Sequence, residues 1–319
     1  MKPRAHLLIP LCLIIACLIA EAAWAQIRRK PSDASSYEEI IGKKFADCIG
    51  CPEMMVVPGG WFVAYPREVD GVFKGDRYPV LINHAFAVGV YDVTRSQYAQ
   101  FVRETERLGG PGCQFLDGNS WRADSRLTWD HPGFAQTDND PVVCVSYLDA
   151  TDYIAWLNSK LTPESMAKLG KYRIPTGAEW EFVARRGASR AYDYFGAGAI
   201  KLDQANFGAE ECGPCGGAIR GRDRWLYTSP VASFDPNAFG IYDIAGNVWQ
   251  WTSECTDRGG APDVQLVEPA RSDCRVVSLR GGSFNDVPGL SAWIAIRNGY
   301  RLAVRNNANG FRVVRRLDR

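Results

Sequence analysis

The sequence predicts an α+β domain with unusually little regular secondary structure, carried on an exported chain. Three observations point to it: an N-terminal export signal, few helix-length patterns among many short strand-length ones, and abundant glycine and aromatic residues. The chain has 319 residues, of which 31 are Gly, 10 Trp and 13 Tyr. This mixture indicates many turns and irregular segments held together by aromatic packing.

Residues 1–25 are predicted to be a signal peptide. Lys2 and Arg4 give a positive start, an apolar run follows over residues 7–20, and the stretch 23–25 has small residues where a signal peptidase cuts. The run is too short for a comfortable membrane span, and no later segment offers about 20 uninterrupted apolar residues. A lipoprotein signal ending at Cys17 is the alternative. We therefore expect a secreted or periplasmic protein without a transmembrane segment in its mature chain.

One domain is expected after the signal. Residues 26–46 are largely polar and are predicted to form a flexible N-terminal segment, and residues 47–319 show no further boundary. The 37 Lys and Arg residues nearly balance 36 Asp and Glu residues, and no basic run is present. This charge pattern argues against a nucleic-acid-binding surface.

Eight cysteines follow the signal, and an even number in an exported chain predicts disulfide bonds. Their order suggests the pairs Cys48–Cys51, Cys113–Cys144, Cys212–Cys215 and Cys255–Cys274. Two alternatives remain for the CxxC pairs. A zinc site of four thiolates is disfavoured by oxidation, and a redox-active CxxC is weaker because neither pair lies at a predicted strand-to-helix turn.

Three segments carry helix-start signals, and short strands are expected between them. The predicted N-terminal caps are Thr94 with Gln97, Ser146 before Tyr147, and Thr176 with Glu179, and glycines at 109–110 and 187 are expected to end the first and third helices. The strand candidates are residues 55–57, 61–63, 86–88, 276–279 and 311–314.

Nine motifs in order then make the chain recognisable. They are CPEMMVVPGG (51–60), VTRSQY (93–98), PVVCVS (141–146), YRIPT (172–176), AEWEFVAR (178–185), NAFGIYD (237–243), GNVWQW (246–251), RGGSF (280–284) and GFR (310–312). From about residue 51 to residue 315 the chain resembles the formylglycine-generating enzyme, or sulfatase-modifying factor, family. The resemblance implies a C-type-lectin-like α+β fold, which agrees with the pattern above.

The resemblance leaves the reaction open, because the family is functionally mixed. Its founding members oxidise a sulfatase cysteine to formylglycine with oxygen and with copper held by two cysteines. Others resemble a domain of ergothioneine synthesis or a periplasmic protein of pyoverdine maturation. In the founding enzymes one catalytic cysteine lies three residues after the Ser of Gly-Gly-Ser, and the second lies five further on. From Ser283, these positions are Asp286 and Ser291.

Neither position carries a thiol, so copper-dependent formylglycine formation is not expected: soft sulfur ligands select Cu(I), whereas a carboxylate and a hydroxyl do not. Asp286 could act as an acid or base, but a solvated loop residue is the favoured interpretation. The cleft candidates implied by the family are Ser283, Asp286, Ser291, Trp249 and Arg297.

Few histidines are available as metal ligands. After the signal only His84 and His131 remain, which leaves a site of two histidines and Asp130 or Asp138 as a remote alternative. Calcium is the better-supported cofactor, because the resemblance implies two structural sites of oxygen ligands. The first would use Asn206, Phe207, Asp223 and Trp225, and the second Asp243, Gly246, Val248 and Gln250, where relatives usually have Glu in place of Gln250.

Two functions remain open at this point. One is an exported binding protein that holds a peptide, a protein segment or a small ligand in the family cleft. The other is a divergent periplasmic oxidoreductase that matures a secreted protein, peptide or siderophore. Arg297, Arg301 and Arg305 recur at four-residue spacing and could bind an anion, but pairing with neighbouring loops is the default expectation.

Overall fold

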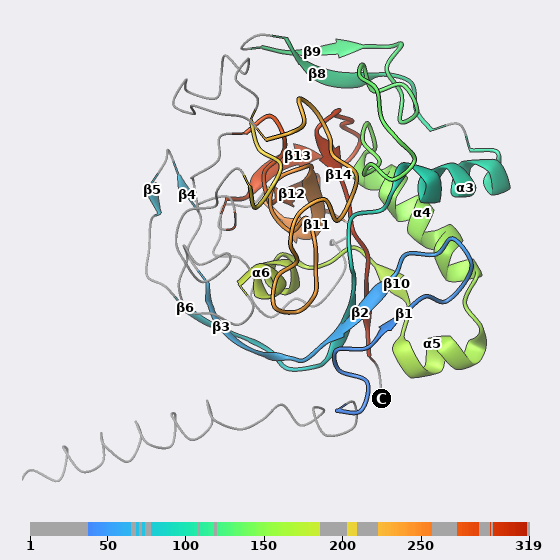
Figure 1. Ribbon diagram of the computed structural model, residues 1–319, viewed down its shortest axis with the longest axis vertical. Helices are drawn as coiled ribbons and strands as arrows, with labels where there is room; N and C mark the ends of the chain where they lie inside the picture. Colours follow the sequence, from blue (N-terminus) through green and yellow to red (C-terminus); the bar gives the residue numbers. More distant parts are fainter. Residues whose placement is uncertain are drawn as a thin grey trace, which may run out of the picture.

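The computed structural model in Figure 1 describes two sheets, four helices and three hairpins among the residues it places. The described residues are 38–64, 68–69, 72–73, 78–107, 109–117, 120–185, 203–208, 223–256, 273–286, 294 and 296–317. The predicted signal peptide, Cys212, Cys215, Gly187 and Ser291 lie outside these ranges. Within them, no helix is both long enough and apolar enough to cross a membrane.

The first sheet has five antiparallel strands in the order β1-β2-β7-β15-β10. Its members are β1 (Lys44–Phe45), β2 (Met54–Val57), β7 (Phe86–Gly89), β15 (Val314–Arg316) and β10 (Tyr172–Arg173). Every residue of β2 and β7 is buried, and since side chains alternate along a strand, both faces of the sheet centre are covered. β15, the last strand of the chain in the described residues, lies between β7 and β10, so strands from both ends of the domain share this sheet.

The second sheet has the order β13-β12-β11-β14. It consists of β13 (Asn298–Arg301), β12 (Val276–Arg280), β11 (Trp249–Cys255) and β14 (Asn309–Gly310). Gln250, near the start of β11, lies opposite Arg280, at the end of β12. The turn that precedes β11 and the loop that follows β12 therefore meet at the same end of the sheet.

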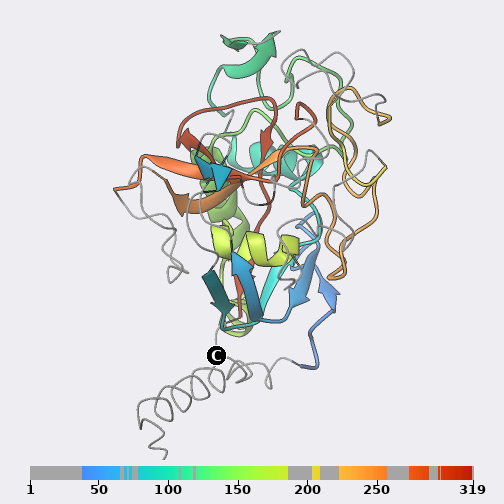
Figure 2. The same cartoon turned by 90° about the vertical axis from the view of Figure 1, so that its left-hand side faces the viewer.

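Four helices cover the sheets: α3 (Arg95–Thr105), α4 (Tyr147–Ser159), α5 (Pro163–Leu169) and α6 (Gly177–Arg185). The predicted caps are confirmed, because Thr94, Ser146 and Thr176 each exchange hydrogen bonds with the residue three positions later. Figure 2 shows α6 between the blue strands of the first half of the chain and the orange strands of the second sheet. Its side chains are buried throughout most of its length, as this position requires.

Three hairpins complete the fold: β3 (Gly60–Ala64) with β6 (Tyr78–Ile82), β4 (Glu68–Val69) with β5 (Val72–Phe73), and β8 (Cys113–Asp117) with β9 (Ser120–Asp124). The β8–β9 hairpin stands at one end of the molecule in Figure 1. It is attached by a bridge between Gln114 and Asn306 and by the Cys113–Cys144 disulfide.

Aromatic packing holds the larger core, as expected from composition. Tyr98 and Phe101 of α3 contact Tyr153 of α4, Phe101 also contacts Trp156, and Phe311 packs on Tyr153, with ring centroids 5.4–5.9 Å apart. A second apolar cluster lies around α6 and the β3–β6 hairpin. The predicted α+β class is therefore confirmed, with short elements packed on two cores.

The disulfides Cys48–Cys51, Cys113–Cys144 and Cys255–Cys274 form as suggested. The alternative of a zinc site made by both CxxC pairs is wrong, because Cys48 and Cys51 bond to each other. Cys51 lies shortly before β2 and not at a strand-to-helix turn, as predicted.

Several boundaries differ from the predictions. The flexible segment expected through residue 46 ends earlier, because Lys44 and Phe45 pair with Met55 and Met54. The strand expected at 311–314 lies instead at Val314–Arg316, and the first helix ends at Thr105, before the predicted glycines, with Glu106 in a left-handed conformation. The short helix α5 was missed, although Thr162 caps it and Pro163 is its first residue.

Candidate functional site

The loop after β12 forms the centre of the candidate site. Gly281 and Gly282 have φ angles of +103° and +76°, which disfavour any residue with a Cβ atom. Gly246 donates its amide hydrogen to the Gly281 carbonyl at 3.0 Å, and Phe284 donates to the Asn247 carbonyl at 3.0 Å. The turn before β11 therefore fixes the position of Ser283.

Asp286 is bound to Ser283 rather than solvated, so the favoured sequence interpretation was wrong. Its carboxylate accepts hydrogen bonds from the amide and the hydroxyl of Ser283, both at 2.8 Å, and a third from the Trp249 side chain. Burial raises the pKa of Asp286 to about 6, although these hydrogen bonds oppose the shift. A lone carboxylate in a loop is usually solvated. Here the Ser-x-x-Asp spacing allows the Asp286 side chain to accept hydrogen bonds from Ser283.

Arg297 is not a residue of this cleft. Its guanidinium is buried, donates to Glu254 at 2.7 Å and lies 3.4 Å from Glu181. The same Glu181 pairs with Arg280 and Arg185, so four charged side chains and Glu254 form an ion cluster beneath the second sheet. Arg305 likewise pairs with Asp149, whereas Arg301 is exposed. The structural interpretation of Arg297 and Arg305 is confirmed.

The first calcium ligand set offers side-chain oxygen donors of the kind that calcium takes. Asn206 is 1% exposed and donates to the Tyr227 carbonyl, but its side-chain oxygen has no hydrogen-bond partner. Asp223 accepts from the amides of Phe207 and Trp225 at 2.9 and 2.8 Å, and burial raises its pKa. A buried, unpartnered amide oxygen beside a carboxylate that would have to be ionised is the donor chemistry that calcium takes.

The second ligand set does not fit. The Gln250 side-chain oxygen accepts from the Trp180 indole and from Arg312, both at 2.7 Å, and its amide donates to the Asp243 carbonyl at 2.7 Å. Both lone pairs of that oxygen are therefore used within the protein. Arg312 also donates to the carbonyls of Tyr242 and Asp243, so a positive side chain already contacts two residues of this set, Asp243 and Gln250.

The remote iron-type alternative is not supported by geometry. His84 is 2% exposed and lies between Asn83 and Glu179, whereas His131 is an exposed partner of Asp130. Within the described ranges no three His, Cys, Asp or Glu side chains are grouped so as to hold a metal ion.

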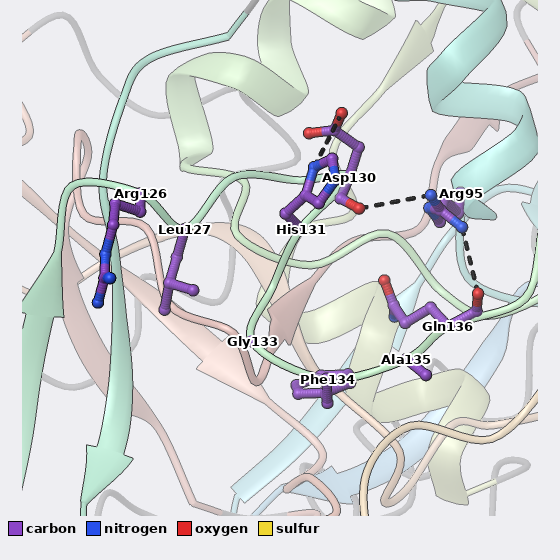
Figure 3. A pocket seen from close by; sticks show the side chains of 9 residues that line it. All are labelled: Arg95, Arg126, Leu127, Asp130, His131, Gly133, Phe134, Ala135 and Gln136. Carbon is purple, nitrogen blue, oxygen red and sulfur yellow. Dashed lines mark hydrogen bonds and ion pairs between the residues drawn. The ribbon is translucent and has the colours of Figure 1, made fainter.

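A groove of about 490 Å³ lies near the candidate site and was missed from the sequence. Figure 3 shows its wall, in which Arg95 donates to the carbonyls of Asp130 and Gln136 and so closes the loop between them. Phe134 of this wall stacks on Tyr227 at 4.5 Å, and both rings contact Phe284, the residue after Ser283. Three aromatic rings therefore join the groove to the Ser283 loop.

The buried residues Asp92 and Arg312 were also missed as partners. Asp92 is fully buried, and Arg312 lies 3.4 Å from its carboxylate. The GFR motif contains Arg312, but nothing in the sequence indicates that Asp92, more than two hundred positions earlier, lies beside it.

The model of the sulfatase-modifying factor enzyme 1-like domain matches residues 43–317. The chain belongs to this family. It is 32% identical over 238 residues to a formylglycine-generating enzyme of Thermomonospora curvata, covering 63% of this chain and 71% of the relative. It is 30% identical over 272 residues to the inactive Cα-formylglycine-generating enzyme 2 of Mus musculus, covering 76% and 77%.

The fold of this family member is shared with a solved structure. PvdO from Pseudomonas aeruginosa superimposes with a TM-score of 0.67 and 30% identity, over 87% of this chain and 99% of that one. The family therefore includes proteins named as enzymes and proteins named as inactive, and the residues of the site must decide between them.

Proposed function

We propose that this exported family member binds a peptide or a small ligand in the cleft around Ser283, Asp286 and Trp249, and does not form formylglycine with copper. The observation that carries the proposal is the Asp286 carboxylate, held by Ser283 and Trp249 at the position of a family thiol. Carboxylate and hydroxyl oxygens are poor ligands for Cu(I), which needs soft sulfur.

The chemistry of this cleft suits a ligand that donates hydrogen bonds. Asp286 has acceptor capacity beyond the bonds it receives, and the absence of side chains at Gly281 and Gly282 lets a ligand approach the backbone closely. An amide N–H or an ammonium group is therefore the expected contact. Export to the periplasm and a structural calcium ion at Asn206 and Asp223 complete the proposal.

A displayed random-peptide library tests it. The wild-type protein is expected to select peptides that bind far more weakly to Asp286→Lys. Asp235→Lys, at an exposed position, supplies the same charge change away from the cleft and should retain the selected peptides. Failure to select any peptide, or equal loss with both variants, would contradict a binding cleft at Asp286.

The second candidate is a divergent periplasmic oxidoreductase that matures a secreted protein, peptide or siderophore. Asp286 favours it in one respect, because a carboxyl group with a pKa of about 6 can give and take protons near neutral pH. A redox-active metal bound in stoichiometric amount by protein purified from the periplasm would support this candidate. Calcium alone would support the binding function.

A further inference from the structure

We infer that the Cys48–Cys51 disulfide exchanges with thiols of a partner chain, with Cys48 as the sulfur that is attacked. This inference is independent of the proposed ligand cleft. It rests on the exposure of the turn that carries the disulfide, on the contacts that hold this turn without it, and on the short chain separation that it spans compared with the other described disulfides.

The turn between the two cysteines is open to solvent on one side only. Cys48 is half-buried, Ile49 is 98% exposed, and Cys51 is 6% exposed. Cys48 packs partly against the larger core but is the more exposed of the two cysteines, so we expect a thiol from solvent to meet Cys48 rather than Cys51. Access of this kind selects which sulfur of a disulfide is attacked.

The backbone of the turn is closed by other contacts. The Cys51 amide donates to the Cys48 carbonyl at 3.1 Å, and Phe45 pairs with Met54 on the far side of the turn. Asp47, next to Cys48, accepts from buried Arg315 at 2.7 and 2.8 Å. Opening the disulfide would leave these contacts intact, so the domain should stay folded when the bond is reduced.

Gly50 fixes the turn against α3. Its φ angle is +78°, and a Cβ atom there would lie 2.2 Å from the Gln100 side-chain oxygen. The turn thus packs against the helix, whereas the Ile49 side chain is exposed. An exposed apolar side chain beside an accessible disulfide offers a contact for an apolar residue that neighbours the partner's thiol.

The other described disulfides differ in the length of chain that they span. Cys113 and Cys144 are 2% and 3% exposed and join residues 31 positions apart. Cys255 is exposed and Cys274 is 5% exposed, but their bond spans 19 positions and joins the end of β11 to the residues that precede its partner β12. Both disulfides close long loops. Cys48–Cys51 joins residues only three positions apart and therefore lowers the entropy of the unfolded chain least among the described disulfides.

The exchange is balanced in two steps. A partner thiolate attacks the sulfur of Cys48, the bond to Cys51 breaks, and Cys51 leaves as a thiolate that takes a proton from water. A second partner thiol then attacks the mixed disulfide and releases Cys48. The partner is oxidised by two electrons to a disulfide while Cys48 and Cys51 become thiols, and a small-molecule disulfide can reverse the reaction.

The test treats the folded, oxidised mature protein with reduced glutathione, traps thiols with N-ethylmaleimide at successive times and maps them by mass spectrometry. We expect Cys48–Cys51 to open at least about tenfold faster than Cys113–Cys144, with an unchanged near-ultraviolet circular dichroism spectrum. With glutathione disulfide, Cys51→Ser should collect glutathione on Cys48, while Cys48→Ser should leave Cys51 largely unmodified. Equal opening rates, preferential modification of Cys51, or unfolding on reduction would overturn the inference.

The variant Ile49→Ser tests whether the exposed Ile49 side chain contacts the partner or only lies beside an accessible disulfide. With glutathione as the probe the variant should react at the wild-type rate. With the synthetic peptide acetyl-Leu-Cys-Phe-amide we expect it to react about threefold more slowly, because the apolar contact is lost. An unchanged rate with the peptide would overturn the role of Ile49.

Discussion

Ser283 donates two hydrogen bonds, from its amide and from its hydroxyl, to the Asp286 carboxylate three residues later, each at 2.8 Å. The pair occupies the loop where the founding enzymes of the family place a thiol. The carboxylate is half-buried, and its pKa of about 6 lies above the ordinary 3.8 because burial disfavours the charged form. Its protonation therefore changes near neutral pH.

Ligand binding should follow this protonation. A ligand that donates to Asp286 binds the ionised carboxylate, so the affinity of a library-selected peptide should fall about tenfold from pH 7.5 to pH 5. Asp286→Asn should weaken binding at pH 7.5 and flatten the pH dependence. Fluorescence polarisation with labelled peptide measures both, and the same pH profile in wild type and variant would exclude Asp286 as the titrating group.

Calcium should act through the Asn206 loop and not through Gln250. With calcium at about a hundred times its dissociation constant, the melting temperature should rise by about 5 °C relative to chelator. The calcium-dependent rise should disappear in Asn206→Ala and persist in Gln250→Ala. Because each variant is compared with itself with and without calcium, its intrinsic loss of stability cancels. A rise lost only in Gln250→Ala would show that the two loops were assigned wrongly.

Asp92 should make stability fall with rising pH. Burial raises its pKa to about 8, above the unfolded value near 3.8, and Arg312 only partly offsets the shift. Between pH 3.8 and pH 8 the Asp92 carboxyl is protonated in the folded state and ionised in the unfolded state. Its contribution to the free energy of unfolding is therefore largest below pH 3.8 and is lost as the pH rises to 8. The slope expected from one group is about 1.4 kcal/mol per pH unit.

Urea unfolding at pH 6, 7 and 8 measures the effect. Asp286 and Asp243, whose pKa values are about 6, titrate at the lower end of this range in wild type and in Asp92→Asn, so the comparison of the two proteins isolates Asp92. Asp92→Asn should be flatter than wild type over this interval. Parallel slopes for the two proteins would show that Asp92 is ionised at pH 6.

Asp47 should anchor the N-terminal part of the domain. Its carboxylate accepts from Arg315, Ser165 and Tyr172, and Arg315 is fully buried. Asp47→Asn removes the charge opposite a buried guanidinium and should cost about 3–5 kcal/mol in urea unfolding. Asp124→Asn breaks an ion pair with Arg126, which is 86% exposed, and should change stability little. Comparable losses in both variants would contradict the anchoring role.

The sequence predicted the parts of this fold that are encoded locally. Capping signals at Thr94, Ser146 and Thr176 fixed three helix starts, because a cap needs only the next three residues. The order of the cysteines likewise predicted the three described disulfides, each of which joins two cysteines that are consecutive along the chain.

Two failures have their cause in tertiary contacts. Gln250 was assigned to calcium because its position in the motif matched, whereas Trp180 and Arg312, distant in the chain, take its oxygen. Arg297 was placed in the cleft from the family resemblance, but it forms buried ion pairs with Glu181 and Glu254. No local pattern reports which distant partner a buried polar side chain will find.

The most direct test of the central claim is mass spectrometry of a synthetic cysteine peptide from a sulfatase active-site loop after incubation with copper-loaded protein and oxygen. We predict no formylglycine in the peptide with the wild-type protein, because Asp286 and Ser291 stand where two thiolates would hold Cu(I). Copper-dependent conversion of the peptide cysteine to formylglycine by the wild-type protein would contradict the account.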